Sequence, residues 1–107
     1  MDQREFGLPS RTLATVRGIL AAEPKVEKAI LYGSRAMGNF KNGSDIDLTL
    51  VGADLDSGAL GSIAGDLDES DIPYKVDLSI LARIGNPNLV DHIRRVGKVF
   101  WERSPGD

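Results

Sequence analysis

Residues 33–47 read GSRAMGNFKNGSDID, and they decide how the rest of the chain is interpreted. The stretch joins Gly33-Ser34 to Asp45-x-Asp47 across ten intervening residues, and a strand-like apolar run lies on each side. Glycine lets a backbone approach phosphate closely, and carboxylates hold divalent cations. The stretch therefore predicts a phosphate-binding turn followed by two acids on one strand, which suits phosphoryl or nucleotidyl transfer.

The flanking sequence predicts a small α/β domain. Hydrophobic periodicity and turn residues place helices at about 9–22, 34–37, 57–69 and 87–96, and strands at about 26–32, 45–51 and 74–81. Ser10 and Asn86 suit the N-cap positions of the first and last long helices. We expect a mixed sheet of three or four strands, the fourth from the apolar tail at 99–101, with helices mainly on one face and the other face partly open.

Length and composition limit the classes of protein to consider. A chain of 107 residues, 41% apolar and 27% charged, fits one globular domain over 1–107 with its core at about 10–102. The absence of cysteine excludes disulfides, thiolate catalysis and zinc–thiolate sites. No secretion signal or membrane-length apolar run occurs, so we expect a cytoplasmic protein without a membrane partner. Nine acids and one base in residues 42–82 argue against direct nucleic-acid binding.

Three acids lie inside apolar strand-like runs, where a carboxylate needs a partner. Strand alternation points Asp45 and Asp47 to the same side, about 6.6–6.8 Å apart along the strand. Asp77 is the acid of the next predicted strand, and it completes a three-carboxylate metal site if the two strands pair. Taken singly, Asp45 could close a turn and Asp77 could pair with Lys75, but the combination favours catalysis.

The turn at Gly33-Ser34 lies where a strand gives way to a helix, so its backbone N–H groups are free for phosphate. Taken alone, Gly-Ser is more often an ordinary loop. The Ser34 hydroxyl adds a donor, and Arg35 or Lys41 could add positive charge against a triphosphate. With Ser44 beside the acids, these make up the candidate nucleotide-binding residues.

These residues resemble the DNA polymerase β-like nucleotidyltransferase superfamily. The neighbouring residues Tyr32-Gly33-Ser34-Arg35-Ala36, Ser44-Asp45-Ile46-Asp47-Leu48 and Tyr74-Lys75-Val76-Asp77-Leu78, with the short chain, are similar to its minimal nucleotidyltransferases, the MNT proteins. Met37 departs from a second arginine found in many relatives. The resemblance implies two Mg²⁺ ions on Asp45 and Asp47, with Asp77 binding the catalytic metal and helping to activate the acceptor hydroxyl. It also implies that Gly33 and Ser34 hold the triphosphate of ATP.

The same resemblance implies a partner protein. Superfamily members usually bind the acceptor with a helical domain that this sequence lacks, and minimal forms are often antitoxins paired with a helical HEPN toxin, some transferring AMP to it. We expect contacts through the open sheet face or through Val99-Phe100-Trp101, although Phe100 and Trp101 fit core packing better. His92 is expected to have an ordinary surface or packing role. Two alternatives stay open: an antitoxin that acts by contact alone, and a transferase for small molecules such as aminoglycosides.

Overall fold

The computed structural model describes residues 4–104, which form four α-helices and four strands. In chain order the elements are α1 Ser10–Ala22, β1 Lys28–Tyr32, α2 Ser34–Met37, β2 Ile46–Val51, α3 Ser57–Glu69, β3 Val76–Ile80, a 3₁₀ turn Leu81–Arg83, α4 Pro87–Val96 and β4 Lys98–Glu102. The predicted fold class and order of elements are confirmed. The apolar tail forms the fourth strand.

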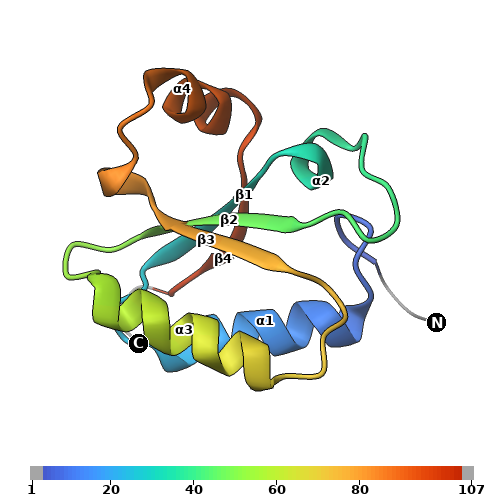
Figure 1. Ribbon diagram of the computed structural model, residues 1–107, viewed down its shortest axis with the longest axis horizontal. Helices are drawn as coiled ribbons and strands as arrows, with labels where there is room; N and C mark the ends of the chain where they lie inside the picture. Colours follow the sequence, from blue (N-terminus) through green and yellow to red (C-terminus); the bar gives the residue numbers. More distant parts are fainter. Residues whose placement is uncertain (1–3, 105–107) are drawn as a thin grey trace.

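The four strands make one mixed sheet in the order β3-β2-β1-β4 (Figure 1). Strand β1 is antiparallel to both of its neighbours, β2 and β4. Strands β2 and β3 are parallel, and α3 makes the crossover between them. Consequently β2, which carries the second half of the motif, lies between two paired neighbours inside the sheet.

The hydrophobic core lies between the sheet and the two long helices α1 and α3, which Figure 1 shows together on one side of the sheet. Strand β2 contributes Ile46, Leu48 and Leu50, all with 0% exposure. The helices face them with apolar side chains at helical spacing: Leu13, Val16 and Leu20 from α1, and Ala59, Ile63 and Leu67 from α3. This packing holds β2 in place from one side.

The opposite side of the sheet is covered in part by α4, with α2 beside it (Figure 1). Ile93 of α4 is buried, and a side chain added at Gly97 would meet Ile30 of β1. The second face of the sheet, which we expected to be partly open, is therefore partly covered by α4.

The ends of the helices follow the predicted residues with one shift. Asn86 caps α4, because its side chain accepts hydrogen bonds from the N–H groups of Asn88 and Leu89. Gly38 ends α2 in the left-handed conformation, with φ 85°. The cap position of α1 falls on Pro9, one residue before the predicted Ser10.

The C-terminal strand closes the core, which was the favoured prediction for its aromatic residues. Phe100 is buried, and Trp101 is partly buried. The Arg17 Nε donates to the Phe100 carbonyl at 2.9 Å, which fixes β4 against α1. Within residues 4–104, no helix combines the length and apolar character needed to cross a membrane.

Candidate active site

The predicted acids meet at the N-terminal ends of the parallel strands β2 and β3, beside the Gly33 turn that follows β1. The register pairs Asp47 of β2 with Asp77 of β3, and Asp47 also lies opposite Tyr32 of β1. Neighbouring strands are about 4.8 Å apart, so the two carboxylates start from adjacent backbone positions on the same face. Asp45 lies just before β2 and is exposed, as Asp77 is, whereas Asp47 is half-buried. The predicted pairing of the two strands is thus present.

Asp47 is the electrostatic centre of this group. Burial is the main cause that raises its pKa above the usual range, and the negative charges of Asp77 and Asp45 raise it further. The nearby His92 side chain acts in the opposite direction and lowers the pKa of Asp47. Burial and two like charges disfavour the charged form of Asp47, so a bound cation would stabilise that carboxylate.

The donor set fits a hard divalent cation, since three carboxylates supply only oxygen ligands. Among residues 4–104, however, no three or more His, Cys, Asp or Glu side chains are grouped as a ready-made metal cage. Mg²⁺ usually takes one or two carboxylates and completes its shell with water and substrate phosphates. The acids therefore fit a site that a nucleotide would complete, and the assignment of all three as ligands stays a prediction.

Gly33 brings the backbone of the predicted phosphate turn against Asp47. Its φ of 75° and ψ of −157° are accessible almost only to glycine, and an added Cβ would collide with the Asp47 Oδ2. Its carbonyl accepts the N–H groups of both Ala36 and Met37 as α2 begins. The two halves of the motif are thus in direct contact, with Ser34 opening the helix beside the acids.

Arg35 of α2 is buried and bonds to neighbouring segments of the chain. Its side chain is only 3% exposed, and it donates to the carbonyls of Ser44 at 3.0 Å and Phe6 at 2.9 Å. The guanidinium also lies over the rings of Phe40 and Tyr74, each 5.1 Å from the ring centroid. Burial lowers the pKa of Arg35. The Arg35 guanidinium is buried, so it is not exposed for the predicted contact with a triphosphate. We therefore leave Arg35 out of the proposed phosphate contacts.

Lys41 and Ser44 form a closed turn directly before the acids. The Ser44 hydroxyl accepts from the Lys41 N–H at 2.9 Å, and the Ser44 N–H donates to the Lys41 carbonyl at 3.0 Å. Gly43 supplies the positive φ of 84° that this turn needs. Ser44 therefore shapes the loop, and Lys41 is exposed on the same turn.

His92 belongs to the site although its sequence context gave no reason to place it there. Its Nε2 accepts a hydrogen bond from the Gly33 N–H at 3.3 Å, so this N–H is not free for phosphate as the sequence predicted. Its ring meets the edge of Tyr32, with centroids 6.2 Å apart and an interplanar angle of 82°. No local pattern on α4 could have revealed this contact, because 59 residues separate His92 from Gly33.

A short polar layer continues from the acids along the same face of the sheet. The Ser79 hydroxyl donates to the Thr49 hydroxyl at 2.8 Å, and Thr49 has 0% exposure. Burial is the main cause that raises the pKa of Tyr32, and the nearby Asp47 and Asp77 charges raise it further, against a hydrogen bond with Ser79. The face that carries the acids is thus polar and internally bonded.

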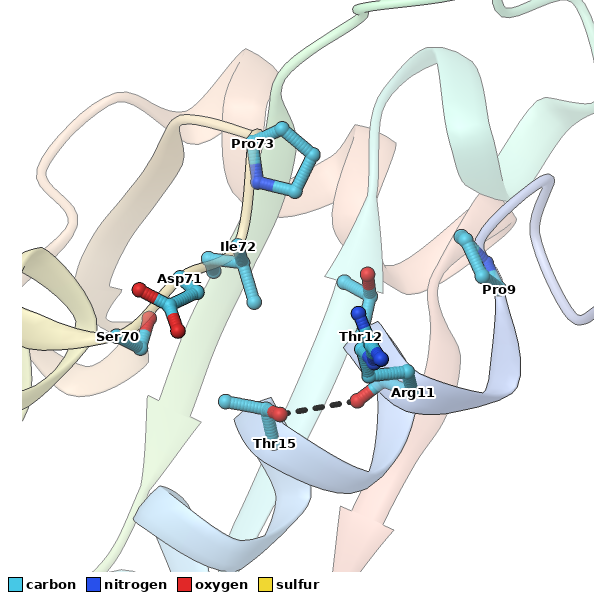
Figure 2. Close-up of a pocket in the computed structure, with 8 residues that line it drawn as sticks. All are labelled: Pro9, Arg11, Thr12, Thr15, Ser70, Asp71, Ile72 and Pro73. Carbon is cyan, nitrogen blue, oxygen red and sulfur yellow. Dashed lines mark hydrogen bonds between the residues drawn. The ribbon is translucent and has the colours of Figure 1, made fainter.

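A surface hollow of about 940 Å³ lies elsewhere (Figure 2). It lies between the start of α1, with Arg11 and Thr15, and the segment from Ser70 to Pro73 that precedes β3. Thr15 donates its hydroxyl to the Arg11 carbonyl there at 2.9 Å. None of the predicted site residues lines this hollow, so its size does not mark the candidate active site.

The sequence profile of the family described as Polymerase beta, Nucleotidyltransferase matches residues 14–106. The chain belongs to the polymerase β nucleotidyltransferase family. The match includes the Gly33 turn, the three acids and His92. The family match confirms the resemblance drawn from the motif.

Solved structures similar to this nucleotidyltransferase include antitoxins in complex with toxins. One, a toxin–antitoxin with AMP-PNP, is 29% identical, with a TM-score of 0.69 over 85% of this chain and 73% of that one. Another, a tri-AMPylated Shewanella oneidensis HEPN toxin in complex with MNT antitoxin, is 26% identical, with a TM-score of 0.64 over 87% and 71% of the two chains. Structural neighbours of this nucleotidyltransferase thus include MNT antitoxins of HEPN–MNT pairs.

A more distant neighbour shows how widely the fold is shared. A nucleotidyltransferase from Sulfolobus solfataricus, described as putative, is 18% identical, with a TM-score of 0.55 over 89% of this chain and 80% of that one. That likeness concerns the fold alone. No curated protein matches this nucleotidyltransferase significantly.

Proposed function

We propose that this nucleotidyltransferase transfers AMP from ATP to a hydroxyl of a helical HEPN-type partner in a Mg²⁺-dependent reaction, and acts as the antitoxin of that partner. One observation carries the proposal: the register sets Asp47 beside Asp77 while Asp47 packs against the backbone of Gly33. This joins the acids to the predicted phosphate turn. The AMP-PNP and tri-AMPylated toxin of the neighbouring structures support adenine as the base and a protein as the acceptor.

The chain's own residues divide the work between them. The carboxylates of Asp45, Asp47 and Asp77 would hold Mg²⁺, which when bound would neutralise charge on the phosphates. Gly33 and Ser34 would receive the triphosphate, with Lys41 adding charge from the neighbouring turn. Asp77 is exposed and so accessible to an incoming hydroxyl, and we assign to it a share in taking up the hydroxyl proton.

The transfer is an in-line displacement. The acceptor oxygen forms a bond to the α-phosphorus, the bond from that phosphorus to the bridging oxygen breaks, and pyrophosphate leaves with the electron pair. The protein contributes mainly position and charge, because no covalent intermediate with a side chain is needed. Asp47 is central, because it lies against the Gly33 turn and the charges of both other acids raise its pKa.

The test uses the purified protein, the HEPN-type partner that we propose is encoded alongside it, Mg²⁺ and labelled ATP. The partner should gain AMP, detected as label and as an added mass. Asp47→Asn should lower the rate at least about a hundredfold, because several kcal/mol of charge stabilisation depend on the metal ligands. Asp71→Asn removes an acid from the hollow of Figure 2 and is the matched control, with an expected rate close to wild type.

Two outcomes would overturn parts of this proposal. Normal labelling by Asp47→Asn would show that the assigned acids are not the catalytic ones. Full neutralisation of the toxin in cells by an Asp45→Asn/Asp47→Asn double variant would show that contact alone is sufficient, and that the antitoxin role does not need the chemistry.

The partner surface that we propose lies on the α4 side of the sheet. Val90 and Val99 are two of the exposed large apolar side chains of the described residues, and with Ile30 they line a hollow of about 400 Å³. Ile30 and Tyr32 are on the same face of β1, two residues apart, so the hollow adjoins the acids along the strand. A helix packed there could present a hydroxyl to Asp77.

Val99→Asp should weaken binding of the partner, because it puts a charge into the apolar hollow. Val99 is 53% exposed, so the fold should tolerate the change. Met37→Asp, at another exposed apolar position, is the control and should leave binding unchanged. Calorimetric titration of each variant with the partner measures the difference, and equal affinities would rule out this surface.

A further inference from the structure

The hydrogen bond between α4 and the predicted phosphate turn is unusual in the atoms that it joins. Strand β1 ends at Tyr32, so the Gly33 N–H lies beyond the strand ladder, and α2 uses only the carbonyl of Gly33. The Gly33 N–H is directed instead to the His92 Nε2 at 3.3 Å, in a partly buried place. A partly buried N–H needs an acceptor, and α4 supplies it.

We propose that His92 is a positioning residue for nucleotide binding, which holds Gly33 through an acceptor nitrogen at Nε2. The bond requires a neutral imidazole whose proton is on Nδ1, because Nε2 must offer a lone pair. It fixes the amide of a residue whose φ is 75°, and that conformation keeps the turn against Asp47. The inference rests on the proposed function in one respect: it assumes that the turn receives the triphosphate.

A packing role and a positioning role make different demands on this residue. For packing against Tyr32, a side chain of similar size is sufficient. For positioning, an acceptor atom must reach the place that Nε2 occupies. Glutamine carries its carbonyl oxygen about as far from the backbone as Nε2, whereas asparagine carries it only about as far as Nδ1. The pair His92→Gln and His92→Asn therefore separates the two roles with side chains of the same chemistry.

The kinetic test measures AMP transfer at varied ATP concentration. His92→Asn and His92→Ala should raise the KM for ATP about three- to tenfold with little change in kcat, because one hydrogen bond that supports binding is lost in ground state and transition state alike. His92→Gln should return KM to within about twofold of wild type, since one acceptor replaces another. Equal KM values for the Gln and Asn variants would overturn the proposal.

A second measurement does not depend on catalysis. In the ¹⁵N-labelled free protein, a coupling across the hydrogen bond should join the Gly33 amide nitrogen to the His92 Nε2, and the ring shifts should show the proton on Nδ1. A proton on Nε2 would overturn the proposal. If the coupling is present but no partner is labelled, the proposed reaction is at fault, whereas normal transfer without the coupling counts against the role of His92.

Discussion

The two faces of β2 differ in almost every physical respect although they belong to one strand of six residues. One face carries Ile46, Leu48 and Leu50, which α1 and α3 bury completely. The other carries Asp47 and Thr49, which lie among hydroxyl groups, carboxylates and the imidazole of α4. The apolar face holds the strand in place, and the polar face can then keep like charges close together at a cost in stability. Four substitutions test this division.

The apolar face should give the largest effect on stability. Leu48→Ala removes a fully buried side chain and should cost about 2–5 kcal/mol of unfolding free energy, from lost burial and the cavity left behind. Urea denaturation measures it. The Asp47→Asn variant on the opposite face should lose none, and a loss of similar size there would contradict the division between the faces.

The contact between Asp47 and the Gly33 turn should give the next largest effect on stability. Gly33→Ala places a Cβ against the Asp47 carboxylate at φ 75°. The change should lower the free energy of unfolding by about 1–3 kcal/mol and should also weaken nucleotide binding. Thermal unfolding and binding of AMP-PNP measure both losses. Gly61→Ala is the control, since nothing lies within 4 Å of its Cβ, and it should stabilise α3 by about 0.5–1 kcal/mol.

The polar layer should show a smaller and coupled effect. Ser79→Ala removes the hydroxyl that donates to buried Thr49 and should cost about 1 kcal/mol. In the Thr49→Val background the same change should cost less, because the bond between the two hydroxyls is already absent. A double-mutant cycle by urea denaturation measures this coupling. Strict additivity would mean that the Ser79–Thr49 bond does not stabilise the face.

The smallest effect should be the dependence of stability on pH at Asp47. Its folded-state pKa is raised above 3.8, mainly by burial, so its charged form opposes folding above that folded pKa. Metal-free Asp47→Asn should therefore be more stable than wild type at neutral pH. The gain should shrink as pH falls through the raised pKa and vanish below the ordinary value, where Asp47 is protonated in both states. Urea midpoints across a pH series with EDTA measure it, and a gain that grows toward low pH would reverse the assigned sign.

The candidate site could be predicted only as far as its residues lie close together in the sequence. Asp45, Asp47, Gly33 and Ser34 follow from one local stretch, and Asp77 from the alternation of a single strand. The role of Arg35 was not accessible in this way, because its partners are Ser44, Phe6 and two rings from different segments. A cation beside a phosphate turn suggests a ligand contact until its burial is known.

The sequence by itself determined the elements and the class of fold, and it supplied the acids and the turn that we propose carry the chemistry. These depend on the alternation of apolar residues and on the backbone freedom of glycine, which act over a few residues. The tertiary structure alone decided that Asp47 and Asp77 share a register, that α4 covers part of the second face, and that His92 reaches Gly33. The last of these relations joins residues 59 positions apart. They are set by how helices and strands pack around the common core, because no local preference connects such distant residues.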